Sequence, residues 1–310
     1  MGGFVEPVVV PTPVVTDGGN FYLGGAGNDS LTMDSSVIGL GGMGGDDTLT
    51  AGSGGSFLYG DFFSVEFFNG SVPNYDFSVV GNDLLIGGAS EDIMVGGPGN
   101  DTMIGGGGGD LYILIGGGRD VIQEAAGGGR DTVLTNASTY TLGRNLEGLQ
   151  FGTLWGGFSK DVHGIGNAAN NQIDGSGGND TLEGLQGNDM LSGGLGHDTL
   201  IGGEGSDTFA FGFGQSSYGD MRIFGRHSDL VSDFTPGFDH FELATMSFNL
   251  FALWPGDMRA AQFGIVGTAL TGKERVLYDQ DTGELTNRDG QIFAQVTPGL
   301  ALTFNDFDWV

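Results

Sequence analysis

A nine-residue stretch that recurs without gaps decides the fold: residues 193–201 read GGLGHDTLI, and residues 202–210 read GGEGSDTFA. Residues 96–104 and 105–113 repeat the pattern G-G-x-G-x-D-x-U-x, in which U is a large apolar residue. We number each repeat from one to nine, so that the aspartate holds position six and the apolar residue position eight. So much glycine is costly in backbone entropy unless a turn needs positive φ or a close approach of the backbone. The pattern therefore predicts a glycine turn followed by a short strand whose central apolar side chain faces inward.

The turn has the composition of a cation site. A tight glycine turn directs several carbonyl oxygens into one small space, and the carboxylate at position six adds a formal charge there. Oxygen-only ligands in a flexible loop suit calcium, whereas magnesium requires a stiffer octahedron. The repeats are therefore expected to bind Ca²⁺.

The chain resembles the RTX, or haemolysin-type, calcium-binding proteins of Gram-negative bacteria, whose repeats have this pattern. Three stretches outside the nonapeptides are also similar to that family: residues 131–149, residues 229–239, and residues 277–290 with the terminal 306–310. The resemblance implies an all-β fold, a parallel β-roll in two blocks with a β-rich C-terminal cap. It also implies an uncleaved type I secretion signal near the C-terminus.

The spacing of the aspartates agrees with this fold. Two nonapeptides make one turn of the roll, so position six should recur every eighteen residues. This spacing holds for Asp29/Asp47, Asp83/Asp101, Asp92/Asp110, Asp180/Asp198 and Asp189/Asp207. A disordered linker would not also keep Leu182, Leu191, Leu200 and Phe209 nine residues apart.

The resemblance further implies which residues hold the ions, because in the family each ion lies between two position-six residues and the carbonyls of the glycine turns. The implied pairs are those five and Asn171/Asp189, in which Asn171 offers a neutral oxygen. The implied turn ligands are Gly96, Gly97, Gly99, Gly105, Gly184, Gly193, Gly194, Gly196 and Gly202. Counting repeats predicts about 6–10 ions. Ser56 holds position six of the repeat at 51–59, and that site is expected to be weak or empty.

The pattern divides the chain into five parts. Residues 1–20 are expected to be a flexible arm, and residues 21–134 a first roll with a phenylalanine-rich insertion at 60–80. That insertion is expected either to pack against the roll or to form an exposed apolar patch. Residues 135–163 are expected to be bridging strands, residues 164–212 a second roll, and residues 213–310 the cap with the secretion signal.

Charge and composition narrow the function. The 310 residues carry 39 acidic against 10 basic side chains, a net charge of −29, which argues against nucleic-acid and anionic-membrane partners. There is no cysteine, so disulfides cannot staple the fold. No apolar run approaches the length of a membrane helix, and the N-terminus lacks the pattern of a cleaved signal peptide, so export is expected by another route.

No catalytic motif stands out: the four histidines are scattered singly, with no H-E-x-x-H, and no G-x-S-x-G occurs. We therefore expect no catalytic residues and no enzyme. The sequence favours a secreted protein that folds on extracellular calcium, with a structural, surface-layer, matrix or adhesion role. Expected partners are calcium, the type I secretion machinery and, by self-association or adhesion, another copy or a cell-surface glycan. The alternative is the secretion and stability module of an RTX exoenzyme or toxin of protease, lipase or epimerase type.

Overall fold

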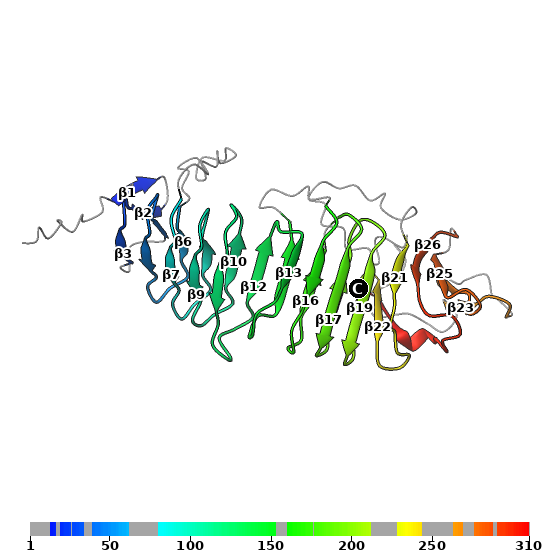
Figure 1. The fold of residues 1–310 in the computed structure, drawn as a ribbon. Coiled ribbons are helices and arrows are strands. Elements are labelled where there is room, and N and C mark those ends of the chain that lie inside the picture. Colours follow the sequence, from blue (N-terminus) through cyan, green and yellow to red (C-terminus); the bar gives the residue numbers. More distant parts are fainter. Residues whose placement is uncertain are drawn as a thin grey trace, which may run out of the picture. The chain divides into compact units, whose positions relative to one another are not determined.

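A computed structural model describes residues 13–16, 19–25, 27–33, 39–61, 80–152, 160–175, 177–211, 228–243, 263–268, 276–287 and 290–309. The chain forms two compact units, Met1–Val133 and Leu134–Val310. Within the described residues the secondary structure is β, apart from the short 3₁₀ helix η3 (Phe304–Asp306) (Figure 1). No described helix is long and apolar enough to span a membrane.

The first unit is a parallel β-roll in which successive strands alternate between two sheets. One sheet contains β1 (Pro13–Thr16), β2 (Gly19–Leu23), β4 (Gly39–Gly41), β6 (Phe57–Tyr59), β8 (Ile93–Val95) and β10 (Leu111–Leu114). The other contains β3 (Ser30–Thr32), β5 (Thr48–Thr50), β7 (Leu84–Ile86), β9 (Thr102–Ile104) and β11 (Val121–Gln123). Neighbouring strands are parallel, except that β1 and β2 form an antiparallel pair. The chain passes into the second unit within β12 (Thr132–Thr135).

Register in the first unit follows the repeat. Leu31 lies opposite Leu49 and Met94 opposite Tyr112, each pair eighteen residues apart. Where residues 62–79 intervene, the offset rises to 36, since Leu49 lies opposite Leu85. The phenylalanine-rich insertion itself lies outside the described residues. Residues 13–16, assigned by sequence to the flexible arm, form β1, while residues 1–12 are not described.

Apolar side chains in the middle of the short strands build the core of this roll. The central residue of each three-residue strand points inward because side chains alternate along a strand. These buried residues are Leu31, Leu40, Leu49, Leu58, Leu85, Met94, Met103 and Tyr112. The inward position eight predicted from the repeat is thus confirmed.

The second unit has the same construction. One sheet orders β14 (Gly148–Phe151), β16 (Gln172–Asp174), β18 (Met190–Ser192), β20 (Thr208–Phe211), β22 (His240–Leu243) and β27 (Phe307–Trp309). The other orders β13 (Thr139–Thr141), β15 (His163–Ile165), β17 (Thr181–Gln186), β19 (Thr199–Glu204), β21 (Asp229–Val231), β26 (Ile292–Gln295), β25 (Glu284–Asn287), β24 (Val276–Tyr278) and β23 (Phe263–Ile265). Pairing is parallel except for β24–β25 and β25–β26.

Two features of this unit differ from the sequence-based division. The strands expected to bridge two rolls, β13 and β14, are parallel rungs of the second roll itself, pairing with β15 and β16. Beyond the last glycine repeat, β21 and β22 add another turn, pairing in parallel with β19 and β20. The roll therefore extends past the glycine-rich sequence on both sides.

Aromatic side chains cover the C-terminal end of the second roll. The rings of Phe234 and Phe241 stack with their centroids 4.3 Å apart, and Phe241 stacks on Phe307 at 5.1 Å. Phe211 meets Phe293 edge to face at 5.6 Å. These side chains bury apolar surface that a bare solenoid end would expose to water.

Candidate metal sites

The glycine turns stack along two edges of the first unit, because each turn crosses from one sheet to the other. The first edge consists of the turns that end at Asp29, Asp47, Asp83, Asp101 and Asp120. The second edge consists of the turns that end at Ser56, Asp92, Asp110 and Asp131. Parallel register places position six of each turn beside position six of the next.

Hydrogen bonds join the position-six residues into ladders. In each pair, Oδ1 of the later aspartate accepts a hydrogen bond from the backbone N–H at position six of the preceding turn. In the first unit the pairs, donor first, are Asp29/Asp47, Asp47/Asp83, Asp83/Asp101, Asp101/Asp120, Asp92/Asp110 and Asp110/Asp131, at 2.8–3.1 Å. In the second unit they are Val162/Asp180, Asp180/Asp198, Asp198/Asp229, Asn171/Asp189, Asp189/Asp207 and Asp207/Asp239, at 2.7–3.0 Å. The structure thus brings together the members of all six pairs implied by the sequence.

The second carboxylate oxygen of these aspartates is the feature that points to a cation. Among the described residues, Oδ2 is buried and accepts no hydrogen bond in Asp47, Asp83, Asp101, Asp110, Asp180, Asp189 and Asp198. A buried carboxylate oxygen without a partner is costly, because it has lost its water and gained nothing in return. A bound cation would supply the missing partner, so the residues present fit Ca²⁺.

The glycine at position one completes the oxygen cradle. A Cβ on Gly184 would collide with Oδ2 of Asp189 in its own turn, and would come within 2.6 Å of the carbonyl oxygen of Gly202 in the next turn. The corresponding Cβ would also collide with the position-six carboxylate at Gly96, Gly105, Gly193 and Gly202. Glycine is needed here because carboxylate and carbonyl oxygens converge on the space that a side chain would fill.

The other predicted turn glycines serve the backbone. Gly97 and Gly194, at position two, have φ of 96° and 94°, and Gly99 and Gly196, at position four, have φ of 158° and 141°. Residues with a Cβ rarely adopt this left-handed region. These glycines therefore set the direction of the carbonyl groups around the cradle.

Two position-six residues considered in the sequence analysis, Asn171 and Ser56, are not aspartates. Asn171 Oδ1 accepts a hydrogen bond from Asn167 N–H at 2.8 Å, and its Nδ2 donates to the Leu146 carbonyl at 3.1 Å. The oxygen expected to act as a neutral ligand is therefore already hydrogen-bonded within its own turn. Ser56 is buried, and its hydroxyl donates to the Gly54 carbonyl at 3.0 Å.

Some position-six aspartates lie outside the set of ligands named from the sequence. Asp229 and Asp239 take their places in the ladders of the second unit, 31 and 32 residues after their partners. Neither follows a G-G-x-G turn, but each stands two residues before an inward apolar residue, Val231 and Phe241. The D-x-U spacing is therefore the sequence signal that identifies Asp229 and Asp239 as position-six residues. Asp120 and Asp131, which end looser repeats, join the ladders of the first unit.

Asp61 is a further carboxylate that the repeat pattern does not predict. It is buried beside the first edge, and it accepts a hydrogen bond from Gly81 N–H, just after the insertion. Burial raises the pKa values of Asp47, Asp83 and Asp101, and the charge of Asp61 adds to this effect.

Position five forms a second ladder, which runs in the opposite direction. The Asn82 side-chain Oδ1 accepts a hydrogen bond from Asn100 N–H at 3.0 Å, and Asn100 Oδ1 accepts one from Arg119 N–H at 2.9 Å. In the second unit Asn179 Oδ1 accepts one from His197 N–H at 2.9 Å. Position six is bonded to the turn before it, and position five to the turn after it.

The electrostatics of the apo ladders favour protonation. Burial, with help from neighbouring carboxylates, raises the pKa of Asp83 to about 8 and those of Asp101, Asp110 and Asp180 to about 7. In the last turn, burial and Asp198 raise the pKa of Asp229 to about 8. A divalent cation reverses this preference, because it supplies the opposite charge and requires deprotonated ligands.

The profile of the RTX calcium-binding nonapeptide repeat, four copies long, matches residues 15–32, 41–62, 79–112, 165–200 and 184–217. The chain carries RTX calcium-binding nonapeptide repeats. Several Ca²⁺ ions are its cofactors, as the repeat composition predicted. The matched ranges contain both glycine turns and strands of the two RTX rolls.

No curated protein sequence matches the chain. A solved structure similar to it is the solution structure of the AlgE6R3 subunit from the Azotobacter vinelandii mannuronan C5-epimerase. That likeness has 27% sequence identity and a TM-score of 0.32, and covers 50% of this chain and 82% of the other.

Proposed function

We propose that this RTX protein is secreted, folds when it meets extracellular calcium, and then serves a structural role in a surface layer, matrix or adhesion. The observation that carries the proposal is the stack of buried Oδ2 atoms that accept no hydrogen bond among the described residues. The proposed ligands are these oxygens and the carbonyls of the position-one glycines.

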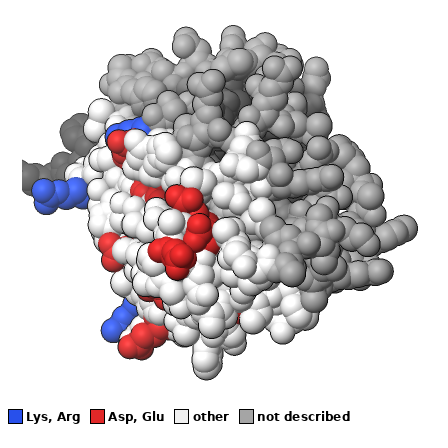
Figure 2. Space-filling view, turned by 90° about the vertical axis from the view of Figure 1, so that its right-hand side faces the viewer, with Lys and Arg blue, Asp and Glu red and all other residues white. Residues whose placement is uncertain are grey.

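The calcium dependence of folding follows from the charge of the chain. With a net charge of −29 and aspartates stacked along each edge, the apo roll carries repulsion that few basic side chains offset. Figure 2 shows one face on which acidic side chains gather and few basic ones are seen. Cation binding removes this repulsion, so its free energy adds to the free energy of folding.

The compartment in which the protein folds follows from the calcium affinity expected of its sites. Extracellular calcium modules bind at about 0.1–1 mM, far above the concentration at which intracellular calcium sensors respond. Such sites would remain empty inside the producing cell, leaving the chain unfolded and able to pass a secretion channel. Outside the cell, the same sites would fill and the rolls would form.

Calcium titration of the EGTA-stripped protein tests the proposal, with circular dichroism as the readout and magnesium as the control ion. A cooperative transition from coil to β-structure near millimolar calcium, absent with magnesium, is the expected result. Folding that is complete at micromolar calcium, or in EGTA, would refute it.

The structural role is tested separately on the folded protein. Calcium-dependent pelleting, filaments or glycan binding would support it. Turnover in a protease, esterase and glycan-epimerase screen, lost on mutation of a described residue in the C-terminal region, would instead support an exoenzyme or its module.

A further inference from the structure

One turn on the second edge departs from the repeat, and the departure brings a third carboxylate into the cradle. Gly87 follows β7 and Gly105 follows β9, each at position one of its turn. After β11 the equivalent place is held by Glu124. The turn is also longer, since Asp131 lies 21 residues after Asp110 instead of eighteen.

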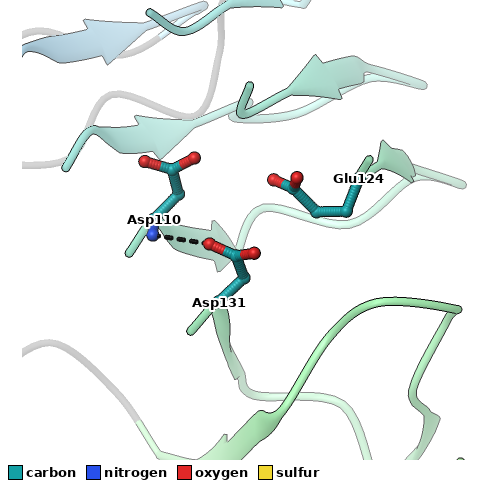
Figure 3. Close-up of side chains that lie close together, drawn as sticks. All are labelled: Asp110, Glu124 and Asp131. Carbon is teal, nitrogen blue, oxygen red and sulfur yellow. Dashed lines mark hydrogen bonds between the residues drawn. The ribbon is translucent and has the colours of Figure 1, made fainter. Parts of the chain in front are cut away.

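The side chain of Glu124 points toward the position-six carboxylates of two successive turns. Asp110, Glu124 and Asp131 each offer one oxygen, and these oxygens all lie within 4.8 Å of one another (Figure 3). Asp110 is only 2% exposed, and its Oδ1 accepts a hydrogen bond from Asp92 N–H at 2.8 Å. Its Oδ2 is buried and accepts no hydrogen bond within the described parts of the chain. An unpartnered, buried carboxylate oxygen therefore belongs to this group.

A comparison of the surroundings of Gly87 and Gly105 shows which oxygen of the cradle Glu124 replaces. A Cβ on Gly87 would meet Asp92 Oδ2 and the carbonyl oxygen of Gly105 in the next turn. A Cβ on Gly105 would meet Asp110 Oδ2 and, in place of a next-turn carbonyl, Glu124 Oε1. A charged carboxylate oxygen thus takes the place of a neutral carbonyl oxygen in the cradle.

Tyr112 holds this carboxylate in position. It occupies position eight, where the preceding repeats have Met94 and Met103, and its side chain is fully buried. Its hydroxyl donates a hydrogen bond to Glu124 Oε1.

We propose that Asp110, Glu124 and Asp131 form a distinct three-carboxylate cation site, which binds Ca²⁺ more tightly than the repeat sites and accepts trivalent lanthanides. The reason is charge: the repeat cradles offer two carboxylates and carbonyls, whereas this site offers three carboxylates. Calcium affinity in loop sites rises with the charge and rigidity of the ligands. The inference rests on the proposed function in that the repeat turns are taken as the weaker calcium sites.

Calcium binding by the folded full-length protein tests the affinity. Glu124→Gln keeps the size of the side chain and an acceptor for Tyr112 but removes the third charge. We expect the tightest calcium ion to bind about tenfold more weakly, with the other ions unchanged. Glu91→Gln is the matched control, because Glu91 is an exposed residue of the same edge and its loss changes the net charge equally. Equal calcium isotherms for the two variants would overturn the proposal.

Terbium luminescence locates the ion independently. A phenol close to bound Tb³⁺ sensitises its emission, so Tyr112 reports occupancy of this site. The first equivalent of Tb³⁺ added to the calcium-loaded protein should give sensitised emission that Tyr112→Phe removes and Tyr59→Phe, in β6 of the same unit, retains. Unchanged emission in Tyr112→Phe would contradict the site even if Glu124→Gln failed to fold.

The two proposals fail in different ways. If calcium does not fold the wild-type chain, the proposed function is wrong whatever Glu124 does. If calcium folds the wild-type chain and Glu124→Gln still behaves as Glu91→Gln does, only the three-carboxylate site is wrong.

Discussion

Replacing the position-one glycine Gly42 with alanine tests whether the cradle holds an ion. The added Cβ would collide with the Asp47 carboxylate, would lie 2.7 Å from its Cγ, and would lie 2.8 Å from the carbonyl oxygen of Gly60. The Asp47 carboxylate oxygen and the Gly60 carbonyl oxygen both belong to the proposed cradle. The Gly60 carbonyl is part of the backbone and cannot rotate away. We expect Gly42→Ala to lose one bound ion.

The expected loss of folding free energy follows from the linkage between calcium binding and folding. At 10 mM calcium, one site with a dissociation constant of about 0.1–1 mM stabilises the folded state by about 1.4–2.7 kcal/mol. Gly42→Ala should lose this amount. Alanine in place of glycine otherwise stabilises a protein by about 0.4–1 kcal/mol, through the entropy of the unfolded chain, so this effect is opposite in sign to the expected loss.

Gly54→Ala is the matched control, because a Cβ at Gly54 has no neighbour within 4 Å and the residue lies in the next turn along the chain. The assays are urea unfolding in 10 mM calcium and a count of bound ions by equilibrium dialysis. If Gly42→Ala binds as many ions as Gly54→Ala and has the same unfolding midpoint, the cradle does not hold calcium.

Three other predictions concern protons, the position-five ladder and the aromatic end. In EGTA, acidification from pH 8 to pH 5 should stabilise the rolls. The folded state raises the aspartate pKa values, to about 8 for Asp83 and about 7 for Asp110. These groups therefore contribute stability that is present at low pH and is lost as the pH rises through those values. In calcium the opposite trend is expected, since protons compete with the ion, and circular dichroism in both conditions checks the sign. Asn100→Ala removes the acceptor for Arg119 N–H and the donor to Asn82, so it should cost about 1 kcal/mol in urea unfolding without changing the number of bound ions. Phe241→Ala, at a fully buried ring stacked between Phe234 and Phe307, should cost about 3–5 kcal/mol in calcium; a cost below about 1 kcal/mol would mean that the aromatic end is not packed.

The repeat pattern predicts much of the fold because each nonapeptide carries its own information. Position eight identifies the inward residues, so Leu49, Leu85 and Leu200 could be placed in the core from spacing alone. Position six likewise identifies the aspartates of the ladders, including the partners Asp180 and Asp198.

Other parts of the roll could not be recognised from glycine spacing. β14 and β22 are rungs whose turns are not built on G-G-x-G, so their parallel pairing depends on neighbouring turns rather than on local sequence. The third carboxylate of Glu124 depends on a lengthened turn that brings it beside Asp110, which no fixed spacing encodes. The position-five ladder was missed because the consensus leaves that position open, although asparagine recurs there at Asn82 and Asn100.

The offset of 36 residues between Leu49 and Leu85 has a practical consequence. Eighteen additional residues enter at a single turn of the first edge, yet Asp47 N–H still bonds to Asp83 Oδ1 at 2.8 Å across the interruption. Hydrogen bonds between adjacent rungs therefore set their alignment, and the loop that connects them can be lengthened. Such an edge is a natural point for grafting: a peptide epitope, an affinity tag or a small cargo domain could replace residues 62–79 and be displayed without shifting the rungs on either side.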